Sequence, residues 1–128
     1  MEKIFFSKFS TDSYNLVPLE LKDYIDFKVE RIYFISSKVD DAVTGAHAHY
    51  NEKEFFVVLS GNCVIQIDEG NGLTDIPLSE NEGVYISNKV WHHFEKMSSD
   101  CLICAVSSTN YNPDRSDYVE DYKEFLKI

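Results

Sequence analysis

Gly45-Ala46-His47-Ala48-His49-Tyr50-Asn51-Glu52-Lys53-Glu54 is the stretch that decides the fold of this chain, and Gly61 follows it after one short apolar run. Residues two apart in a β-strand point to the same face of the sheet. We therefore expect His47 and His49 to project together while the small Ala48 faces the other way. The stretch predicts a strand that carries two imidazoles on one surface.

Short apolar or alternating segments recur through the rest of the chain, separated by Gly, Asn, Asp and Ser clusters. This spacing is typical of an all-β sandwich or barrel. We predict strands at residues 3–6, 16–19, 29–37, 46–49, 54–60, 63–68, 74–78, 83–86, 90–96 and 101–107. The glycines in 60–62 and 68–72 suit turns with positive φ, so each segment is predicted to close a hairpin.

The C-terminal tail has a different period. Tyr118, Tyr122 and Phe125 recur at helical spacing after Asp117, whose side chain suits a helix N-cap with Glu120 three residues later. One short C-terminal helix is therefore expected, packed against the barrel or a neighbouring subunit.

The composition limits the class of protein and its partners. The chain has 128 residues, of which 44% are hydrophobic, which predicts a single domain spanning 1–128. The formal net charge of −10 argues against nucleic acid and against an anionic membrane as partners, because both are bound through clustered Lys and Arg. No apolar run reaches the roughly 18 residues that a transmembrane helix needs.

The cysteines point to a reducing compartment. Cys63, Cys101 and Cys104 form an odd set, and the last two lie in an apolar run that is typical of a buried strand rather than a redox loop. With no recognisable signal peptide at the start of the chain, we expect a cytoplasmic protein.

The spacing of the polar residues resembles the two signature motifs of the cupin superfamily, which implies a jelly-roll β-barrel. In many cupins the positions matching His47, His49, Glu54 and His92 hold a metal, and imidazole with carboxylate suits zinc, iron, nickel or manganese. Against a metal, Ser87-Asn88-Lys89 stands where the second motif has its proline, and Glu54 could instead orient an imidazole. Spacing alone leaves open a metal site, a metal-free histidine site or structural histidines.

A closer resemblance covers nearly the whole chain. Its residues are Arg31-Ile32-Tyr33, Gly45 to His49, Val58-Leu59-Ser60-Gly61, Val90-Trp91-His92, Ser98 to Cys101, Ser116-Asp117-Tyr118 and Asp121 to Phe125. Together they resemble the dTDP-sugar 3,4-ketoisomerases. The resemblance implies an isomerase without a metal or other cofactor, usually a cytoplasmic homodimer that exchanges N-terminal strands. It also implies the substrate, dTDP-4-keto-6-deoxy-D-glucose, and a dTDP-3-keto-6-deoxyhexose product that is later aminated for lipopolysaccharide or another surface glycan.

The residue roles follow partly from that resemblance. His49, the second histidine of the pair, is expected to be the base that removes the C3 proton, since histidine titrates near neutrality. His47 is expected to bind or polarise the substrate oxygens. Tyr33 and Arg31 share a strand face, so Tyr33 is expected to relay a proton within the enediol while Arg31 supplies positive charge. Glu54, Trp91 and His92 are expected to contact the substrate.

Two departures from the family pattern weaken the expected phosphate contacts. Thr44 stands where the family usually has an arginine, and Ser13-Tyr14 stand where an Arg-Gly pair often lies. Arg115 and the lysines are the candidate replacements. The sequence leaves open the configuration of the product at C4, and two other functions, a metal-dependent cupin enzyme and a non-catalytic dTDP-sugar binding module.

Overall fold

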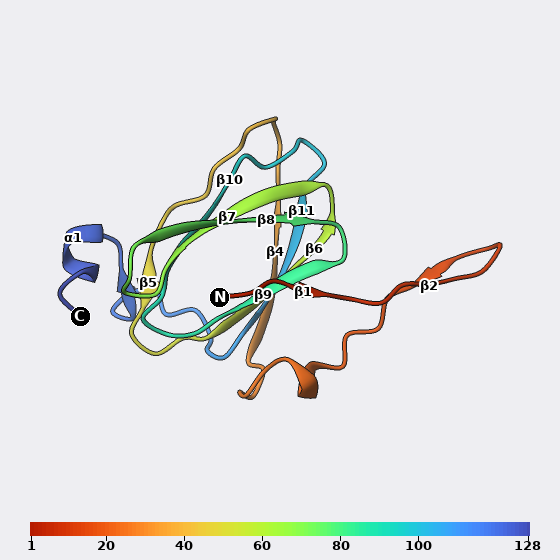
Figure 1. The fold of residues 1–128 in the computed structure, drawn as a ribbon. Coiled ribbons are helices and arrows are strands. Elements are labelled where there is room, and N and C mark those ends of the chain that lie inside the picture. The colour runs from red at the N-terminus through yellow and green to blue at the C-terminus, as the bar shows by residue number, and fades with distance from the viewer.

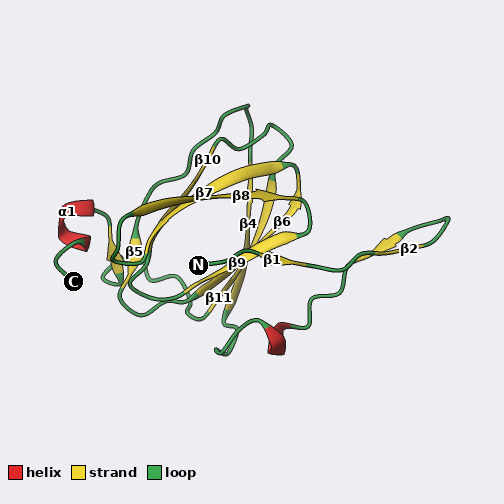
Figure 2. Cartoon of the chain, in the orientation of Figure 1, coloured by secondary structure: helices red, strands yellow, loops and turns green.

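Two antiparallel sheets face each other in the computed structural model, which describes all residues 1–128 (Figures 1 and 2). The five-stranded sheet has the order β1 (Ile4–Phe5), β9 (Glu82–Ile86), β6 (Glu54–Ser60), β11 (Leu102–Ser107), β4 (Arg31–Ser36). The second sheet contains β10 (Trp91–Glu95), β7 (Asn62–Asp68) and β8 (Leu73–Ser79). The predicted all-β jelly-roll class is confirmed.

A small two-stranded unit that contains His49 lies beside the second sheet. β5 (Ala48–His49) pairs with β12 (Tyr118–Val119). Just before β5, His47 and His92 exchange backbone hydrogen bonds of 3.1 and 2.9 Å, which joins this unit to β10. The first histidine pair is thereby held against the strand that carries the third histidine.

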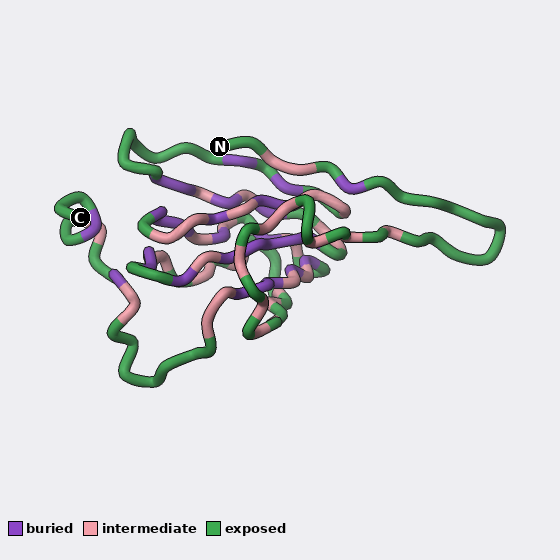
Figure 3. Tube along the Cα trace, turned by 90° about the horizontal axis from the view of Figure 1, so that it is seen from below, coloured by how far each residue is buried: buried purple, intermediate pink, exposed green.

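The core lies between the two sheets and is lined by alternate residues of their strands. Phe56, Ile65 and Ile103 are among its fully buried members. The opposite face of β6 is buried too, because Phe55 packs against Phe6 from the N-terminal segment in a separate cluster. Figure 3 shows this contrast between buried strands and exposed connections.

Of the two predicted hairpins, one is present in the structure and the other is not. Residues 68–72 do connect β7 to β8, which pair from Asp68 opposite Leu73 onwards. Gly61, in contrast, joins β6 to β7 across two different sheets, so the predicted hairpin there is wrong and the segment is a corner of the barrel. The positive φ of 71° at Gly61 agrees with the expected need for glycine.

The C-terminal helix is present but shorter than the sequence period indicated. α1 (Tyr122–Phe125) is capped by Asp121, whose side chain accepts the backbone N–H of Lys123 at 2.7 Å. The predicted start at Asp117 is wrong, because residues 118–119 form β12 and the Asp117 carboxylate instead accepts backbone N–H groups from the 51–52 turn. No helix in the structure has the length and apolar character required to cross a membrane.

The N-terminal region contains elements that the sequence did not predict. β2 (Phe9–Ser10) and β3 (Asn15–Leu16) form a short hairpin that projects far from the barrel in Figure 1, so the strand predicted at 16–19 ends at Leu16. A 3₁₀ turn, η1 (Leu21–Asp23), then leads the chain back along the five-stranded sheet.

Candidate active site

His47 and His49 lie side by side, as their spacing predicted. Their ring centroids are 4.7 Å apart, and the His92 ring from β10 lies 4.7 Å from that of His47. Ala48, between the two, is fully buried on the opposite face. The alternation of a β-strand therefore brings three imidazoles into one cluster.

The cluster opens onto a cavity of about 410 Å³, a size within the usual range for small-molecule sites. Four residues predicted to form the site line it: Arg31, Tyr33, His47 and His92. The Arg31 guanidinium carbon lies 4.7 Å from the centre of the Tyr33 ring, which confirms that these two side chains share a strand face. The remaining lining residues are Ile35, Thr44, Gly45, Phe56, His93, Phe94, Tyr111, Arg115 and Tyr118.

Trp91 lies elsewhere, contrary to the expected substrate contact. Its ring packs on Tyr122 and Phe125 beside α1, with centroid distances of 5.3 and 5.7 Å, and it lines none of the cavities. The physical reason is the same alternation that groups the histidines: because His92 faces the barrel cavity, its neighbour faces the outside of the sheet and anchors the helix.

Glu54 lies within the site but behind its surface. It is fully buried and accepts a hydrogen bond from the Tyr33 hydroxyl. Burial opposes its ionisation, yet hydrogen bonds with His49 and His92 hold the pKa of this carboxyl well below its usual value. The expected direct contact of Glu54 with substrate is therefore not supported: its carboxylate faces Tyr33 and two imidazoles.

Tyr33 keeps its proton in this environment. Burial, together with the charge of Glu54, raises the pKa of the Tyr33 hydroxyl far above its ordinary value. In the structure its single proton is donated to Glu54, so the hydroxyl must turn away from Glu54 to donate to a substrate oxygen in the cavity.

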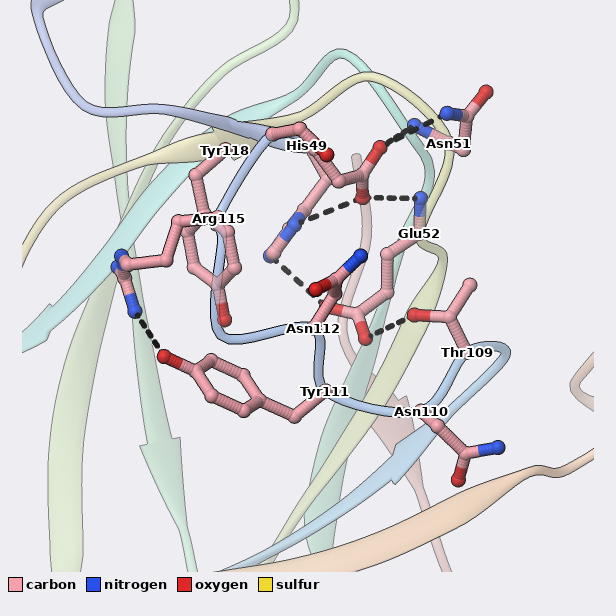
Figure 4. A pocket seen from close by; sticks show the side chains of 11 residues that line it. His49, Asn51, Glu52, Thr109, Asn110, Tyr111, Asn112, Arg115 and Tyr118 are labelled. Atoms are coloured by element: carbon pink, nitrogen blue, oxygen red, sulfur yellow. Dashed lines mark hydrogen bonds and ion pairs between the residues drawn. The ribbon is translucent and has the colours of Figure 1, made fainter.

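His49 is surrounded by carboxylates. Its Nε2 lies 3.0 Å from Glu52 Oε2 and 3.4 Å from Glu54 Oε1, and its Nδ1 lies 3.3 Å from Asp117 Oδ2 (Figure 4). Burial favours the neutral ring, but hydrogen bonds and charge from Glu52 and Glu54 prevail and raise the pKa of His49 to about 9. Nε2 faces two carboxylates, whereas the buried Nδ1 makes no hydrogen bond although Asp117 is 3.3 Å away, and the raised pKa favours the imidazolium at pH 7.

His47 has the opposite character. Burial, together with the charges of His92 and His49, lowers the pKa of His47 to about 4, so its ring is neutral at pH 7. Nδ1 lies 3.3 Å from the Gly45 carbonyl oxygen, and only a protonated Nδ1 can donate to it. The Nε2 lone pair is then free, on a ring that lines the cavity.

Sequence reasoning missed the residues that surround His49. Glu52, Asp117, Tyr111 and Tyr118 line a second, polar cavity that reaches His49 from the other side, drawn in Figure 4. Asp117 and Tyr118 had been assigned to a helix start. Glu52 follows a turn, and the two-residue alternation that grouped the histidines does not extend through a turn.

Arg115, a candidate replacement for the missing arginines, is one of the cations that line the cavity. The Arg115 guanidinium carbon lies 3.9 Å from the centre of the Tyr118 ring, and Arg115 Nη1 lies 3.4 Å from the Tyr111 hydroxyl. Thr44 lines the cavity without charge and accepts the Phe94 backbone N–H at 2.9 Å. Arg115 therefore lines the cavity, but its guanidinium is already paired with Glu120.

The same cluster also bears on the metal alternative. His47, His49, Glu54 and His92 offer ligand atoms that all lie within 4.8 Å of one another, a donor set of the type that transition metals prefer. His49 Nε2 lies 3.0 Å from Glu52 Oε2, and the Tyr33 hydroxyl occupies Glu54 Oε2, whereas Glu54 Oε1 and His92 Nε2 are buried without a hydrogen-bond partner. Metal analysis and chelation decide between the two readings of this donor set. We derive no step through a metal from this geometry.

The FdtA family model, described as WxcM-like, C-terminal, matches residues 1–128. The chain is 34% identical over 123 residues to the TDP-4-oxo-6-deoxy-alpha-D-glucose-3,4-oxoisomerase of Aneurinibacillus thermoaerophilus, covering 95% of this chain and 87% of that relative.

Solved structures of similar proteins have the same fold. WlaRB, a TDP-quinovose 3,4-ketoisomerase from Campylobacter jejuni, superimposes with a TM-score of 0.87 at 26% identity, over 99% of this chain and 97% of that one. WlaRA, a TDP-fucose-3,4-ketoisomerase from the same organism, gives a TM-score of 0.80 at 28% identity, over 98% and 93% of the two chains.

Proposed function

We propose that this chain, which belongs to the FdtA (WxcM-like, C-terminal) family, is a 3,4-ketoisomerase that acts on dTDP-4-keto-6-deoxy-D-glucose. The observation that carries the proposal is the position of the His47 ring on the wall of a cavity that Tyr33 and Arg31 also line, where burial and the neighbouring imidazoles lower the pKa of His47. A base, a hydroxyl donor and a fixed positive charge are the groups that moving a ketone along a sugar ring requires.

The reaction moves the carbonyl from C4 to C3 with no net change in composition. The C3 proton is acidic because the C4 carbonyl lies next to it, and its removal gives an enediolate across C3 and C4. A proton is then added at C4, while the hydrogen on the C3 oxygen is lost and the C3 carbonyl forms. Every proton that leaves one carbon or oxygen is matched by one gained at its neighbour.

His47 is the base in this proposal, in place of His49. A general base needs a lone pair at the start of the reaction, and His47 Nε2 has one, whereas both nitrogens of His49 face carboxylates. The expected division of roles between the two histidines is thus reversed. His49, as an imidazolium whose ring centre is 4.7 Å from that of His47, stabilises the negative charge that develops as the C3 proton leaves.

Tyr33 and Arg31 act on the oxygens. The protonated Tyr33 hydroxyl gives up its hydrogen bond to Glu54 and transfers its single proton to the C4 oxygen, and it regains a proton from the C3 hydroxyl as the C3 carbonyl forms. The Arg31 guanidinium, stacked on the Tyr33 ring, adds positive charge that does not depend on pH. Both groups act on charge that is greatest in the transition state, which is where stabilisation increases the rate.

Turnover of the sugar nucleotide, followed by NMR, tests this function. The purified protein is expected to convert dTDP-4-keto-6-deoxy-D-glucose into the 3-keto isomer. His47→Asn should lower kcat by at least about 10²-fold, the usual contribution of a general base. Gln66→Asn, on the neighbouring strand β7 and outside all the cavities, serves as the control and should retain most activity.

The other outcomes separate the alternatives. Binding of dTDP without turnover would indicate a binding module. Stoichiometric metal in the purified protein, with loss of turnover on chelation, would indicate a metal-dependent enzyme. Full activity in the His47→Asn variant would show that another group is the base.

We further propose that the protein is a cytoplasmic homodimer that exchanges N-terminal strands and supplies a 3-keto sugar for amination into a surface glycan. The projecting β2–β3 hairpin supports exchange, since it leaves Phe9 59% exposed. β4 is an edge strand that pairs only with β11, and its outer face leaves Ile32 and Phe34 exposed. A strand from a second copy would satisfy that edge and cover both side chains.

A further inference from the structure

Glu52 connects two parts of the site that are far apart in the sequence. Its Oε2 accepts from His49 Nε2 at 3.0 Å. Its Oε1 accepts from Arg31 Nη2 at 3.4 Å, from Thr109 Oγ1 at 2.7 Å and from the Ser107 hydroxyl. One carboxylate therefore contacts β4, β5 and the end of β11.

The Glu52 side chain is ionised and already occupied. It is 4% exposed, and although burial opposes ionisation, hydrogen bonds from His49 and from two hydroxyls keep its pKa below the usual value. An ionised carboxylate offers about four acceptor positions, and four donors face this one. Three of these donors share Oε1 and one faces Oε2, and the side chain is buried behind Arg31 and His49, so we infer that Glu52 acts on the reaction through these neighbours.

The two charged neighbours have different positions in the site. Arg31 lines the cavity and stacks on Tyr33, and Glu52 is its ion-pair partner. The His49 ring lies beside His47, the proposed base. Long arginine side chains lose rotamer entropy when they are ordered, so a buried partner that holds Arg31 in advance lowers the free-energy cost of reaching the reactive arrangement.

We propose that Glu52 is a positioning residue of the isomerase: it holds the Arg31 guanidinium against Tyr33 and the His49 ring against His47. This inference rests on the proposed function and extends it to a residue outside the cavity that contains Tyr33 and His47. The Ser107 and Thr109 hydroxyls, in turn, fix the carboxylate of Glu52 in place.

Glu52→Gln tests the proposal, because it keeps the shape of the side chain while it removes the charge and turns an amide N–H₂ towards groups that donate. Misplacement of reacting groups by about 1 Å costs on the order of 10²-fold in rate, so kcat should fall by about that factor, with a smaller change in KM. Thr109→Val, which removes one donor and buries no charge, should lower kcat in the same direction by a smaller factor and remains informative if Glu52→Gln folds poorly.

Asp68→Asn is the matched control. Asp68 is also a fully buried carboxylate, but it accepts from the backbone N–H groups of Gly70 and Gly72 and from the Tyr122 hydroxyl, away from Arg31 and His49. It should lower the melting temperature while kcat stays close to that of the wild type. A similar loss of kcat in Asp68→Asn at equal loss of stability would overturn the proposal, since any buried carboxylate would then have the same effect.

Proton–nitrogen NMR of the substrate-free protein provides a readout that does not depend on turnover. The His49 Nε2–H and Arg31 Nη–H signals should shift in Glu52→Gln and remain in place in Asp68→Asn. Unmoved signals, or an unchanged kcat in an active protein, would overturn the positioning role. If the wild-type protein turns over no sugar nucleotide, the proposed function fails, and the two signals still decide whether Glu52 positions both groups.

Discussion

The immediate neighbours of His47 and His49 shift the pKa values of the two rings in opposite directions, so the charged form is favoured at His49 and the neutral form at His47. His49 has a carboxylate at each ring nitrogen, whereas His47 has a backbone carbonyl at Nδ1 and other imidazoles nearby. An imidazolium next to a neutral imidazole lowers the proton affinity of the latter, since like charges repel. A site with one charged and one neutral ring can stabilise an oxyanion and accept a proton at the same time.

At the same scale, the Tyr33 hydroxyl provides a test of the oxygen-side chemistry. Tyr33→Phe removes the donor to Glu54 and to the substrate but keeps the ring on which Arg31 stacks. We expect kcat to fall by about 10²- to 10⁴-fold while the fold is retained, measured by NMR turnover and thermal melting. Tyr85→Phe, which removes a hydroxyl bonded to Asp26 away from the cavity, is the control; equal activity in both variants would contradict the role of Tyr33.

The alternation of side chains along a strand predicts some contacts of the site but not others. Alternation along a strand was sufficient to group His47 with His49 and Arg31 with Tyr33, because side-chain direction in a strand is set by position. It could not predict which imidazole is charged, since that depends on Glu52 and Asp117, which reach His49 from a turn and from the distant tail. The sequence analysis also predicted that Trp91 contacts the substrate. Strand alternation should have excluded this contact, because a residue next to His92 points to the opposite face of the sheet.

In the C-terminal tail, contacts with distant segments prevail over the local helical period of the sequence. A helical period ran from Tyr118 to Phe125, yet Tyr118 and Val119 pair with β5 and only α1 is helical. The Asp117 carboxylate accepts from the Asn51 and Glu52 backbone N–H groups at 2.8 and 3.1 Å, so it satisfies a turn rather than a helix end. Such contacts between segments far apart in the chain leave no signal in local periodicity.

The corner between β6 and β7 provides a prediction at the scale of elements. A Cβ added at Gly61 would lie 2.5 Å from Ser98 Oγ and 2.7 Å from the Cys101 Cα, in a residue with φ of 71°. Gly61→Ala should therefore lower the free energy of unfolding by more than about 2 kcal/mol, since backbone strain and a clash with main chain add, as measured by urea denaturation. Gly70→Ala, also at positive φ but with nothing within 4 Å of the new Cβ, should cost less. An equal loss in both would mean that the close approach at Gly61 is relieved by movement.

At the scale of the whole molecule, the projecting β2–β3 hairpin predicts that the protein is a dimer in solution. We expect light scattering to give twice the mass of one chain. Phe9→Asp places a charge on the apolar side chain that the exchange would bury, and it should shift the protein to the monomer. Leu73→Asp changes an exposed apolar residue at the β7–β8 turn, away from both the hairpin and β4, and should leave the dimer intact. A dimer that survives Phe9→Asp would locate the interface elsewhere.

The stability of the whole molecule should depend on pH through the same two histidines. The folded pKa of His49 is about 9, above the ordinary 6.5, so its contribution is fully present below pH 6.5 and is lost as pH rises from 6.5 through 9. The folded pKa of His47 is about 4, below 6.5, so unfolding takes up a proton and stability is lost as pH falls from 6.5 through 4. The free energy of unfolding should therefore be highest near pH 6.5.

Urea denaturation between pH 6.5 and 9 measures the His49 contribution. Each unit of pKa shift corresponds to about 1.4 kcal/mol, so the wild-type protein should lose up to about 3 kcal/mol over this interval. His49→Gln removes the titrating ring and should flatten the curve there, although it lowers stability at pH 6.5 because Glu52 and Glu54 lose their cation. His93→Gln, which changes a histidine that faces Glu95 instead, should keep the wild-type slope. If the wild-type protein were as stable at pH 9 as at pH 6.5, the three carboxylates would not be holding His49 as an imidazolium, and the assignment of the base to His47 would lose its physical ground.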